Sequence, residues 1–220
     1  FGVSGRAVKN EVIEIKCFNP REFAEDLHKT VDDRPYGGGP GMVMQIEPLR
    51  LAIGAAREWI GGETLVVYLS PQGALLDQNA VNSFSNLDSL VLVAGRYEGI
   101  DNRVIDAWKM EEISIGDFVL SGGEPAAITL IDACVRLLPG VVGNAQTTLD
   151  ESFVDGLLEY SHYTRPQVWE GRPVPKVLLS GHHSEIREWR KTEAEKITAG
   201  RRPDLWSAYI SGIKETQTKH

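Results

Sequence analysis

The stretch Thr64-Leu-Val-Val-Tyr-Leu69 is a run of apolar residues without polar alternation, and the loop residues Ser-Pro-Gln-Gly follow it directly. Two further runs, Leu90–Ala94 (LVLVA) and Glu112–Ile115 (EISI), likewise end in loops that contain glycine. A strand without alternation is covered on both faces, which is typical of a parallel sheet with helices on each side. The sequence therefore predicts an α/β fold with a parallel sheet.

The loops after these strands are expected to meet at one edge of the sheet. They span Ser70–Gly73, Gly95–Asp101 and Gly116–Gly123. Ligands of open parallel sheets bind outside the carboxyl ends of the strands. The second loop, GRYEGID, places an arginine, an aromatic ring and two carboxylates in a tight turn. Such a density of ionisable groups favours a functional role over a structural one.

Other elements follow from local patterns. The alternation in Glu11–Cys17 (EVIEIKC) predicts a half-exposed strand, and Pro20–Lys29 (PREFAEDLHK) predicts a helix with proline in its first turn. Helical spacing of apolar residues predicts helices over 47–60, 124–138, 184–198 and 204–214. Gly5–Asn10 is typical of the end of a helix. An α/β domain normally opens with a buried strand, and none precedes this helix. We therefore expect that the first strand is missing from this chain.

The domain boundary is placed where the hydrophobic periodicity is lost, in residues 143–155 (GNAQTTLDESFVD). We expect an α/β domain over residues 1–142, a flexible linker over 143–150 and a helical C-terminal domain over 151–220. No signal peptide or membrane span is recognised. The cysteines Cys17 and Cys134 lack metal-ligand spacing, and we expect buried or inert thiols in a reducing compartment, the cytoplasm.

Composition narrows the possible functions. With 42% hydrophobic and 25% charged residues, the chain is typical of a globular protein. Its net charge of −8 favours a small-molecule enzyme over a generic nucleic-acid binder, although a local basic groove is compatible with an acidic total. The glycine-dense Tyr36–Gly41 lacks the Gly-Lys-Ser/Thr ending of a phosphate loop, and His182-His183 lacks the spacing of a metal pair. We therefore expect no structural metal site.

Five motifs together resemble a known family. GRYEGID, SIGDFVLSGGE, VDDRPYGGGPGM, YLSPQG and HYTRP resemble the bacterial tRNA (guanine-N1)-methyltransferases of the SPOUT class, in order from Gly5 to about Leu205. The resemblance implies a trefoil-knotted α/β domain, a small helical tRNA-binding C-terminal domain, and an obligate homodimer whose active site is shared between subunits. It also implies methyl transfer from S-adenosylmethionine to the guanosine immediately 3′ of the anticodon, which maintains the reading frame.

The resemblance also assigns a set of residues to the S-adenosylmethionine site. Glycine loops let backbone N–H and C=O groups read the adenine edge, and apolar neighbours exclude water. Two departures from the family pattern stand here, Phe118 where Tyr is common and Pro125 one residue earlier than the usual proline. The expected cofactor-binding residues are Tyr68, Leu69, Pro71, Gly95, Ser114, Ile115, Gly116, Asp117, Phe118, Val119, Leu120, Gly122 and Gly123.

Catalysis requires a base, because guanine N1 carries a proton at neutral pH. The family places an aspartate directly before Ser-Phe, where this chain has Glu151, with Asp150 one residue earlier. The resemblance implies that one of these carboxylates removes the proton, and we favour Glu151. Arg136 is a candidate to stabilise negative charge on guanine O6, and otherwise a solvated cation at a helix end. Glu98 is expected to fix the guanine or the charged end of the cofactor.

RNA contacts are expected from two groups of residues. Asp32, Arg96 and Tyr97 are the expected substrate-binding residues. Cations of the C-terminal region are candidates to hold the phosphate backbone, although interleaved glutamates are equally typical of a solvated helix with internal ion pairs. These cations are Arg187, Arg190, Lys191, Arg201 and Arg202. Assistance by magnesium stays open.

Three other functions remain open. They are methylation of a different nucleotide by another SPOUT-class RNA methyltransferase, tRNA binding without catalysis, and methylation of a small molecule. The last fits the acidic charge best, and it predicts turnover without RNA and insensitivity to salt.

Overall fold

The computed structural model describes residues 2–142, 151–153 and 155–218. The chain divides into two compact units, residues 1–143 and 144–220. The linker expected over 143–150, with the candidate base Asp150, lies outside the described residues.

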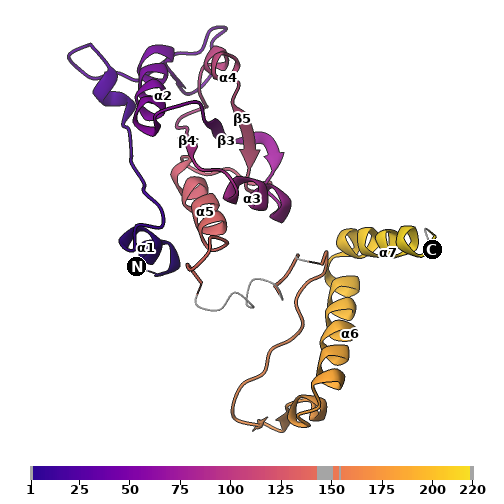
Figure 1. The fold of residues 1–220 in the computed structure, drawn as a ribbon. Helices are drawn as coiled ribbons and strands as arrows, with labels where there is room; N and C mark the ends of the chain where they lie inside the picture. The colour runs from indigo at the N-terminus through magenta and orange to yellow at the C-terminus, as the bar shows by residue number, and fades with distance from the viewer. Residues whose placement is uncertain (1, 143–150, 154, 219–220) are drawn as a thin grey trace. The chain divides into compact units, whose positions relative to one another are not determined.

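The first unit is built on a three-stranded parallel sheet (Figure 1). Its strands are β3 (Leu65–Leu75), β4 (Leu90–Ala94) and β5 (Glu111–Ser114), in the order β4-β3-β5. β3 pairs in parallel with both neighbours, so the predicted parallel sheet and α/β class are confirmed. β4 has the predicted limits, and β5 begins and ends one residue earlier than predicted.

The predicted loop Ser70–Gly73 is an excursion within β3. Leu69 and Ala74 both pair with Ile113, so the four residues between them leave the ladder and return to the same point. A Cβ on Gly73 would collide with the backbone of Glu112 and Ile113. Glycine is therefore needed where the chain returns to β5.

Helices cover both faces of the sheet, as predicted. Val66 and Tyr68 of β3 point into a cluster formed with α2 (Ile46–Ile60) and α4 (Asn102–Trp108). The alternate residues Val67 and Leu69 pack instead against α3 (Gln78–Ser85) and α5 (Glu124–Val135). The absence of polar alternation in β3 thus reflects burial on both sides. Figure 1 shows the two pairs of helices on opposite sides of the strands.

The N-terminal region differs from its prediction. α1 (Gly2–Lys9) ends where the Asn10 N–H donates to the Arg6 carbonyl oxygen, and Glu11 adopts a left-handed φ of 57°. The strand predicted over Glu11–Cys17 is wrong, because this extended segment has no neighbouring strand to pair with among the described residues. Its apolar residues anchor it at two separate places, Ile13 near α1 and Phe18 near α2.

The helix predicted from Pro20 is also wrong beyond its first turn. Only the 3-10 helix η1 (Pro20–Phe23) forms, capped by the Asn19 side chain. The following residues of the predicted helix form a turn instead, because the Asp26 carboxylate accepts hydrogen bonds from the N–H groups of His28 and Thr30. Local side-chain hydrogen bonds of this kind compete with helix formation.

The second unit consists of short elements followed by two helices. The hairpin β6 (Val168–Trp169) and β7 (Arg172–Pro173) precedes the 3-10 helix η3 (Lys176–Leu179). α6 (His183–Arg201) and α7 (Pro203–Thr218) confirm the two predicted helices, each longer than expected.

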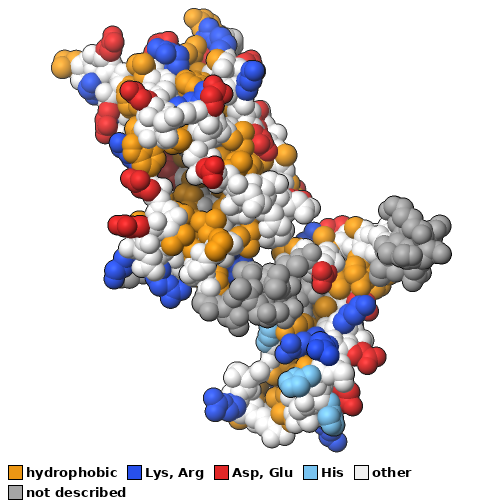
Figure 2. All heavy atoms as spheres, in the orientation of Figure 1, with side chains coloured by type: hydrophobic (Ala, Val, Ile, Leu, Met, Phe, Trp, Pro, Cys, Tyr) orange, Lys and Arg blue, Asp and Glu red, His pale blue; other side chains and the backbone are white. Residues whose placement is uncertain are grey.

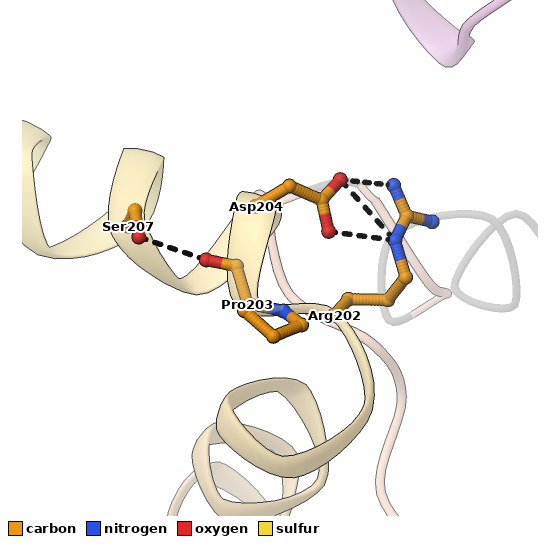
Figure 3. Close-up of polar contacts among 4 residues, drawn as sticks. All are labelled: Arg202, Pro203, Asp204 and Ser207. Atoms are coloured by element: carbon orange, nitrogen blue, oxygen red, sulfur yellow. Dashed lines mark hydrogen bonds and ion pairs between the residues drawn. The ribbon is translucent and has the colours of Figure 1, made fainter.

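The junction of α6 and α7 is held by polar contacts (Figure 3). The Arg202 guanidinium pairs with the Asp204 carboxylate at 2.5 Å, and the Ser207 hydroxyl donates to the Pro203 carbonyl oxygen at 2.8 Å. Pro203 begins α7 without loss of a helical hydrogen bond, because first-turn N–H groups have no partner within the helix.

In the second unit, one buried hydroxyl connects helix α6 to the segment that precedes the hairpin. Thr198 has no exposed surface; its Oγ1 accepts a hydrogen bond from the Leu158 N–H at 2.8 Å and donates one to the Ala194 carbonyl oxygen at 2.7 Å. Nearby, the Trp189 ring contacts Tyr160 and Tyr163. In the part of this unit whose side chains are described, Ala194 and Thr198 are the only buried residues.

The two cysteines have different surroundings. Of the two alternatives expected for the cysteines, buried or inert, burial does not apply to Cys17, which is exposed. Cys134 is half-buried, and burial raises the pKa of its thiol to about 11. Within the described residues, no helix has the length and apolar character needed to cross a membrane.

Candidate functional site

A pocket of about 410 Å³ opens at the carboxyl end of the sheet, where the three predicted loops meet. It contains every residue that the resemblance assigns to cofactor binding except Asp117, together with Arg96, Tyr97 and Glu98. The pocket residues among those assigned are Tyr68, Leu69, Pro71, Gly95, Ser114, Ile115, Gly116, Phe118, Val119, Leu120, Gly122 and Gly123.

Close backbone approach joins the β4 loop to the start of α5. The Gly123 N–H donates to the Gly95 carbonyl oxygen at 2.8 Å, and a Cβ on Gly123 would lie 2.7 Å from the Ala94 Cα. Gly95 itself faces the Tyr68 ring, where a Cβ would lie 2.9 Å from a ring carbon. Pro125 is accommodated in the first turn of α5, so its early position does not disturb the helix start.

The GRYEGID loop is held from its other side by the segment after the glycine-dense stretch. Strand β2 (Val43–Met44) lies beside it: the Met44 N–H donates to the Gly99 carbonyl oxygen at 2.9 Å, and the Asp101 N–H donates to the Met44 carbonyl oxygen at 3.2 Å. Gly41 has φ +80° and leaves no room for a side chain beside Glu98. The glycine-dense stretch therefore supports the pocket wall.

Asp32 belongs to β1 (Asp32–Asp33), which pairs with β2 in an antiparallel ladder, Asp32 opposite Met44. It does not line the pocket. The structure thus places this expected substrate-binding residue behind the strand that supports the GRYEGID loop.

Arg96 and Tyr97 are each held by a side-chain contact from a different element. The Arg96 guanidinium pairs with the Glu124 carboxylate in the first turn of α5, with Nε at 2.8 Å and a terminal nitrogen at 2.7 Å. The Tyr97 hydroxyl accepts a hydrogen bond from Arg21 at 3.1 Å, and the Tyr97 backbone has a left-handed φ of 59°. Both side chains are partly exposed, so they are accessible from outside the pocket.

Buried polar groups lie beneath these loops. Burial raises the pKa of the Tyr68 hydroxyl, and the nearby Glu112 carboxylate raises it further. Several pocket residues were not identified from the sequence, because α4 and the part of β5 before Ser114 lie outside the five motifs and reach the pocket only through packing. These residues include Asn102, Ile105 and Glu112.

Arg136 does not line the pocket. It is the C-terminal cap residue of α5, whereas Gly123, the N-terminal cap residue, lines the pocket. The helix has 12 residues and so separates its ends by roughly 18 Å. Glu151 belongs to the second unit, where it is half-buried beside Ser152, whose Oγ accepts a hydrogen bond from the Glu159 N–H at 3.0 Å.

Among the residues that the structure describes, the cations expected to bind RNA fall into two groups, those with an ion pair or ring contact and those without one. Arg202 is paired with Asp204, and Arg190 lies over the Tyr160 ring at 4.8 Å. Over the ranges that the structure describes, Arg187, Lys191 and Arg201 are exposed and have no ion-pair partner. Figure 2 shows Lys, Arg and His side chains along this unit, with acidic side chains among them.

A metal centre is not apparent in the described part of the chain. Within residues 2–142, 151–153 and 155–218, no group of three or more His, Cys, Asp or Glu side chains is placed to hold a metal ion.

Comparison with known proteins connects this geometry to a family. The family model described as tRNA (Guanine-1)-methyltransferase TrmD matches residues 1–208. A tRNA (guanine-N(1)-)-methyltransferase of Glaesserella parasuis is 55% identical over 209 residues, covering 93% of this chain and 82% of the relative. Enzymes of the same name from Haemophilus influenzae and Stutzerimonas stutzeri are 52% and 55% identical, covering 100% and 98% of this chain and 92% and 86% of their own lengths. The chain therefore belongs to the tRNA (guanine-1)-methyltransferase TrmD family.

Proposed function

We propose that this protein transfers the methyl group of S-adenosylmethionine to N1 of the guanosine 3′ of the anticodon in tRNA, in the cytoplasm, and so maintains the reading frame. The observation that carries the proposal is the pocket at the carboxyl ends of the parallel strands. Its walls are formed by the residues that the family resemblance assigns to the methyl donor, in a chain that belongs to the family.

The pocket fits the proposed methyl donor. Its volume of about 410 Å³ suits a ligand of drug size, and glycines at 95, 122 and 123 expose backbone groups toward it. The bound donor supplies an electrophilic methyl group on a sulfonium. We assign the pocket loops to the SPOUT class with its trefoil knot, in which they hold the donor for in-line attack.

The acceptor chemistry is assigned to Glu151 and Arg136. The Glu151 carboxylate takes the proton from guanine N1, and the ring nitrogen can then attack the methyl carbon. The Arg136 guanidinium stabilises the negative charge that develops on guanine O6. Asp150 is the alternative base, and Glu98 orients the guanine from the pocket wall.

These assignments require a homodimer with shared active sites. Arg136 lies at the far end of α5 from the pocket of its own subunit, so a second subunit has to supply it. Exposed apolar side chains support an interface near the start of α5, since Val119 is 85% and Ile128 is 67% exposed. The interface is therefore proposed to include this end of the helix.

We further propose that residues 151–220 bind tRNA, with Arg187, Lys191 and Arg201 on the phosphate backbone. Asp32, Arg96 and Tyr97 contact the same RNA beside the pocket. Magnesium then acts, if required, on the RNA or at a site completed by it. Chelation with EDTA followed by readdition of magnesium tests that requirement directly.

The activity is tested with labelled methyl donor and an unmodified tRNA transcript that has guanosine 3′ of the anticodon. A transcript with adenosine at that position is the control. Label in the guanosine transcript alone, recovered as 1-methylguanosine after digestion, is the expected result. Label in both transcripts would point to a different target nucleotide, and turnover of a small acceptor without RNA would point to a small-molecule methyltransferase.

The base is tested by Glu151→Gln and Asp150→Asn. Loss of a general base typically lowers the rate about 10²- to 10⁴-fold, so Glu151→Gln is expected to fall in this range and Asp150→Asn to stay near the wild-type rate. The measurement is single-turnover methylation with saturating tRNA. The reverse pattern would assign the base to Asp150, and full activity of both variants would refute a base at either position.

The shared site is tested by mixing two inactive variants. Arg136→Ala removes the cation, and Ile115→Trp fills the pocket. In a mixed dimer the intact pocket of one subunit meets the intact arginine of the other, so up to about a quarter of the wild-type rate should return. A mixture that stays inactive although mass spectrometry detects mixed dimers would place Arg136 in the site of its own subunit.

A further inference from the structure

Glu112 is a pocket residue that the proposed mechanism does not use. It lies in β5 directly opposite Tyr68 of β3, and both side chains line the pocket. The neighbouring Glu111 is exposed and does not line it, because successive side chains of a strand point to opposite faces. Glu112 therefore reaches the pocket through its position in the strand.

Among the residues that the structure describes, no cation is paired with the Glu112 carboxylate. It is half-buried, and within the described residues it forms no hydrogen bond or ion pair. The arginine of the pocket, Arg96, is already paired with Glu124. A partly buried carboxylate without a partner is unfavourable, so this position favours a cationic ligand group.

The other charged groups of the pocket also favour a cationic ligand. Glu98 is the second carboxylate in the lining, and its side chain likewise has no ion pair within the described ranges. With the Arg96–Glu124 pair neutral as a unit, the pocket carries an excess of negative charge. Such a field concentrates positively charged ligands.

We propose that Glu112 is a specificity-determining residue that makes the pocket prefer the positively charged methyl donor over its neutral reaction product. The inference rests on the proposed function, because it takes S-adenosylmethionine as the donor. The donor carries a sulfonium that becomes a neutral thioether, S-adenosylhomocysteine, when the methyl group leaves. The Glu112 carboxylate attracts the sulfonium of the donor and not the thioether of the product. This difference favours replacement of bound S-adenosylhomocysteine by S-adenosylmethionine.

The test is the ratio of the dissociation constants of the product and the donor, measured by titration calorimetry without RNA. For Glu112→Gln we expect donor binding to weaken about tenfold, as for one charge acting over several ångströms at intermediate dielectric, and product binding to change less than twofold. Glu111→Gln is the matched control on the same strand and should leave both constants unchanged. Sinefungin carries an amine in place of the sulfonium centre, so its binding to Glu112→Gln should weaken about as much as binding of the donor.

Two results would overturn the proposal. Equal weakening of donor and product would assign Glu112 to the α-ammonium group that both ligands share, and unchanged binding of both would remove it from the site. Failure of the wild-type chain to bind either ligand would instead refute the proposed function. Ultraviolet titration of the Tyr68 phenol checks the fold of the variant, since burial of the ring should keep the pKa of Tyr68 above its ordinary value even without the Glu112 charge.

Discussion

The two units of this protein are held together in different ways. The first has a parallel sheet with apolar clusters on both faces, and its pocket is formed largely by backbone that glycines allow to approach closely. The second buries only Ala194 and Thr198 among the side chains described there, and its helices present charged groups to solvent. A preformed pocket therefore belongs to one unit and an adaptable charged surface to the other.

The difference indicates where each unit is vulnerable. In a closely packed unit, one extra methyl group has no space and forces the backbone to move. In a unit with little buried apolar surface, a single buried hydrogen bond carries a larger share of the stability, and the exposed charges are the ones proposed to bind RNA.

The largest effect is expected for Gly73→Ala, which places a methyl group against the backbone of Glu112 and Ile113. Overpacking of this kind destabilises by about 3 kcal/mol. The measurement is urea unfolding followed by circular dichroism. Gly54→Ala is the control, because nothing lies within 4 Å of the added Cβ in α2, and it should stabilise the helix by about 1 kcal/mol. Equal stability of the two variants would show that the return of β3 to β5 is not closely packed.

A smaller effect is expected for Thr198→Ala in the second unit. The change leaves the buried Leu158 N–H without its acceptor and should lower the stability of this unit by about 2 kcal/mol. Hydrogen exchange of the amides of α6 reports the local effect. Thr198→Ser keeps the hydroxyl and should lose less than half as much; loss of the same stability in both variants would assign the effect to the methyl group.

Removing single exposed cations should affect RNA binding more modestly. Arg187→Gln and Lys191→Gln are each expected to weaken tRNA binding about fivefold and to reduce the slope of log K against log salt by about one. Fluorescence anisotropy over a range of salt concentrations measures both quantities. Lys196→Gln serves as the comparison, because Lys196 is already paired with Glu193 at 3.8 Å and should change binding less. An unchanged slope in all three variants would move the RNA contact away from α6.

The smallest effect concerns the junction of α6 and α7. The Arg202 guanidinium beside Asp204 lowers the pKa of that carboxyl to about 2 from its ordinary 3.8. Because the folded pKa is depressed, the contribution to stability is present above about pH 4 and is lost as the pH falls toward 2. Carbon NMR should show a midpoint near 2, rising toward 3.8 in Arg202→Gln. An unshifted midpoint in the wild-type chain would show that the pair is open in solution.

The elements predicted correctly are those whose signal is local. The runs at 65–69 and 90–94 are apolar throughout because both faces are covered, and α2 shows helical spacing over its whole length. Glu11–Cys17 shows an equally regular alternation, yet it forms no strand, because a strand also requires a neighbour that the sequence pattern does not supply. At Pro20 the helix signal was overridden by the hydrogen bonds of Asp26.

The same distinction applies to the site. Loop residues such as Gly95 and Gly123 were predicted to gather because strands of a parallel sheet end at one edge. Glu112 and Asn102 were not identified, since their place in the pocket depends on the register of β5 and the packing of α4. Asp32 lies on β1, which pairs with β2 behind the wall of the pocket. Sequence order alone does not indicate this position.

The excursion of β3 at Ser70–Gly73 has a consequence for how such a pocket can change. Both ends of the excursion meet Ile113, so a residue inserted after Pro71 would lengthen the loop without shifting the register of the strand on either side. The entropic cost of lengthening a loop grows only slowly with its length. Ligand preference at this wall is thus free to diverge, by evolution or by engineering, while the sheet that supports it is inherited unchanged.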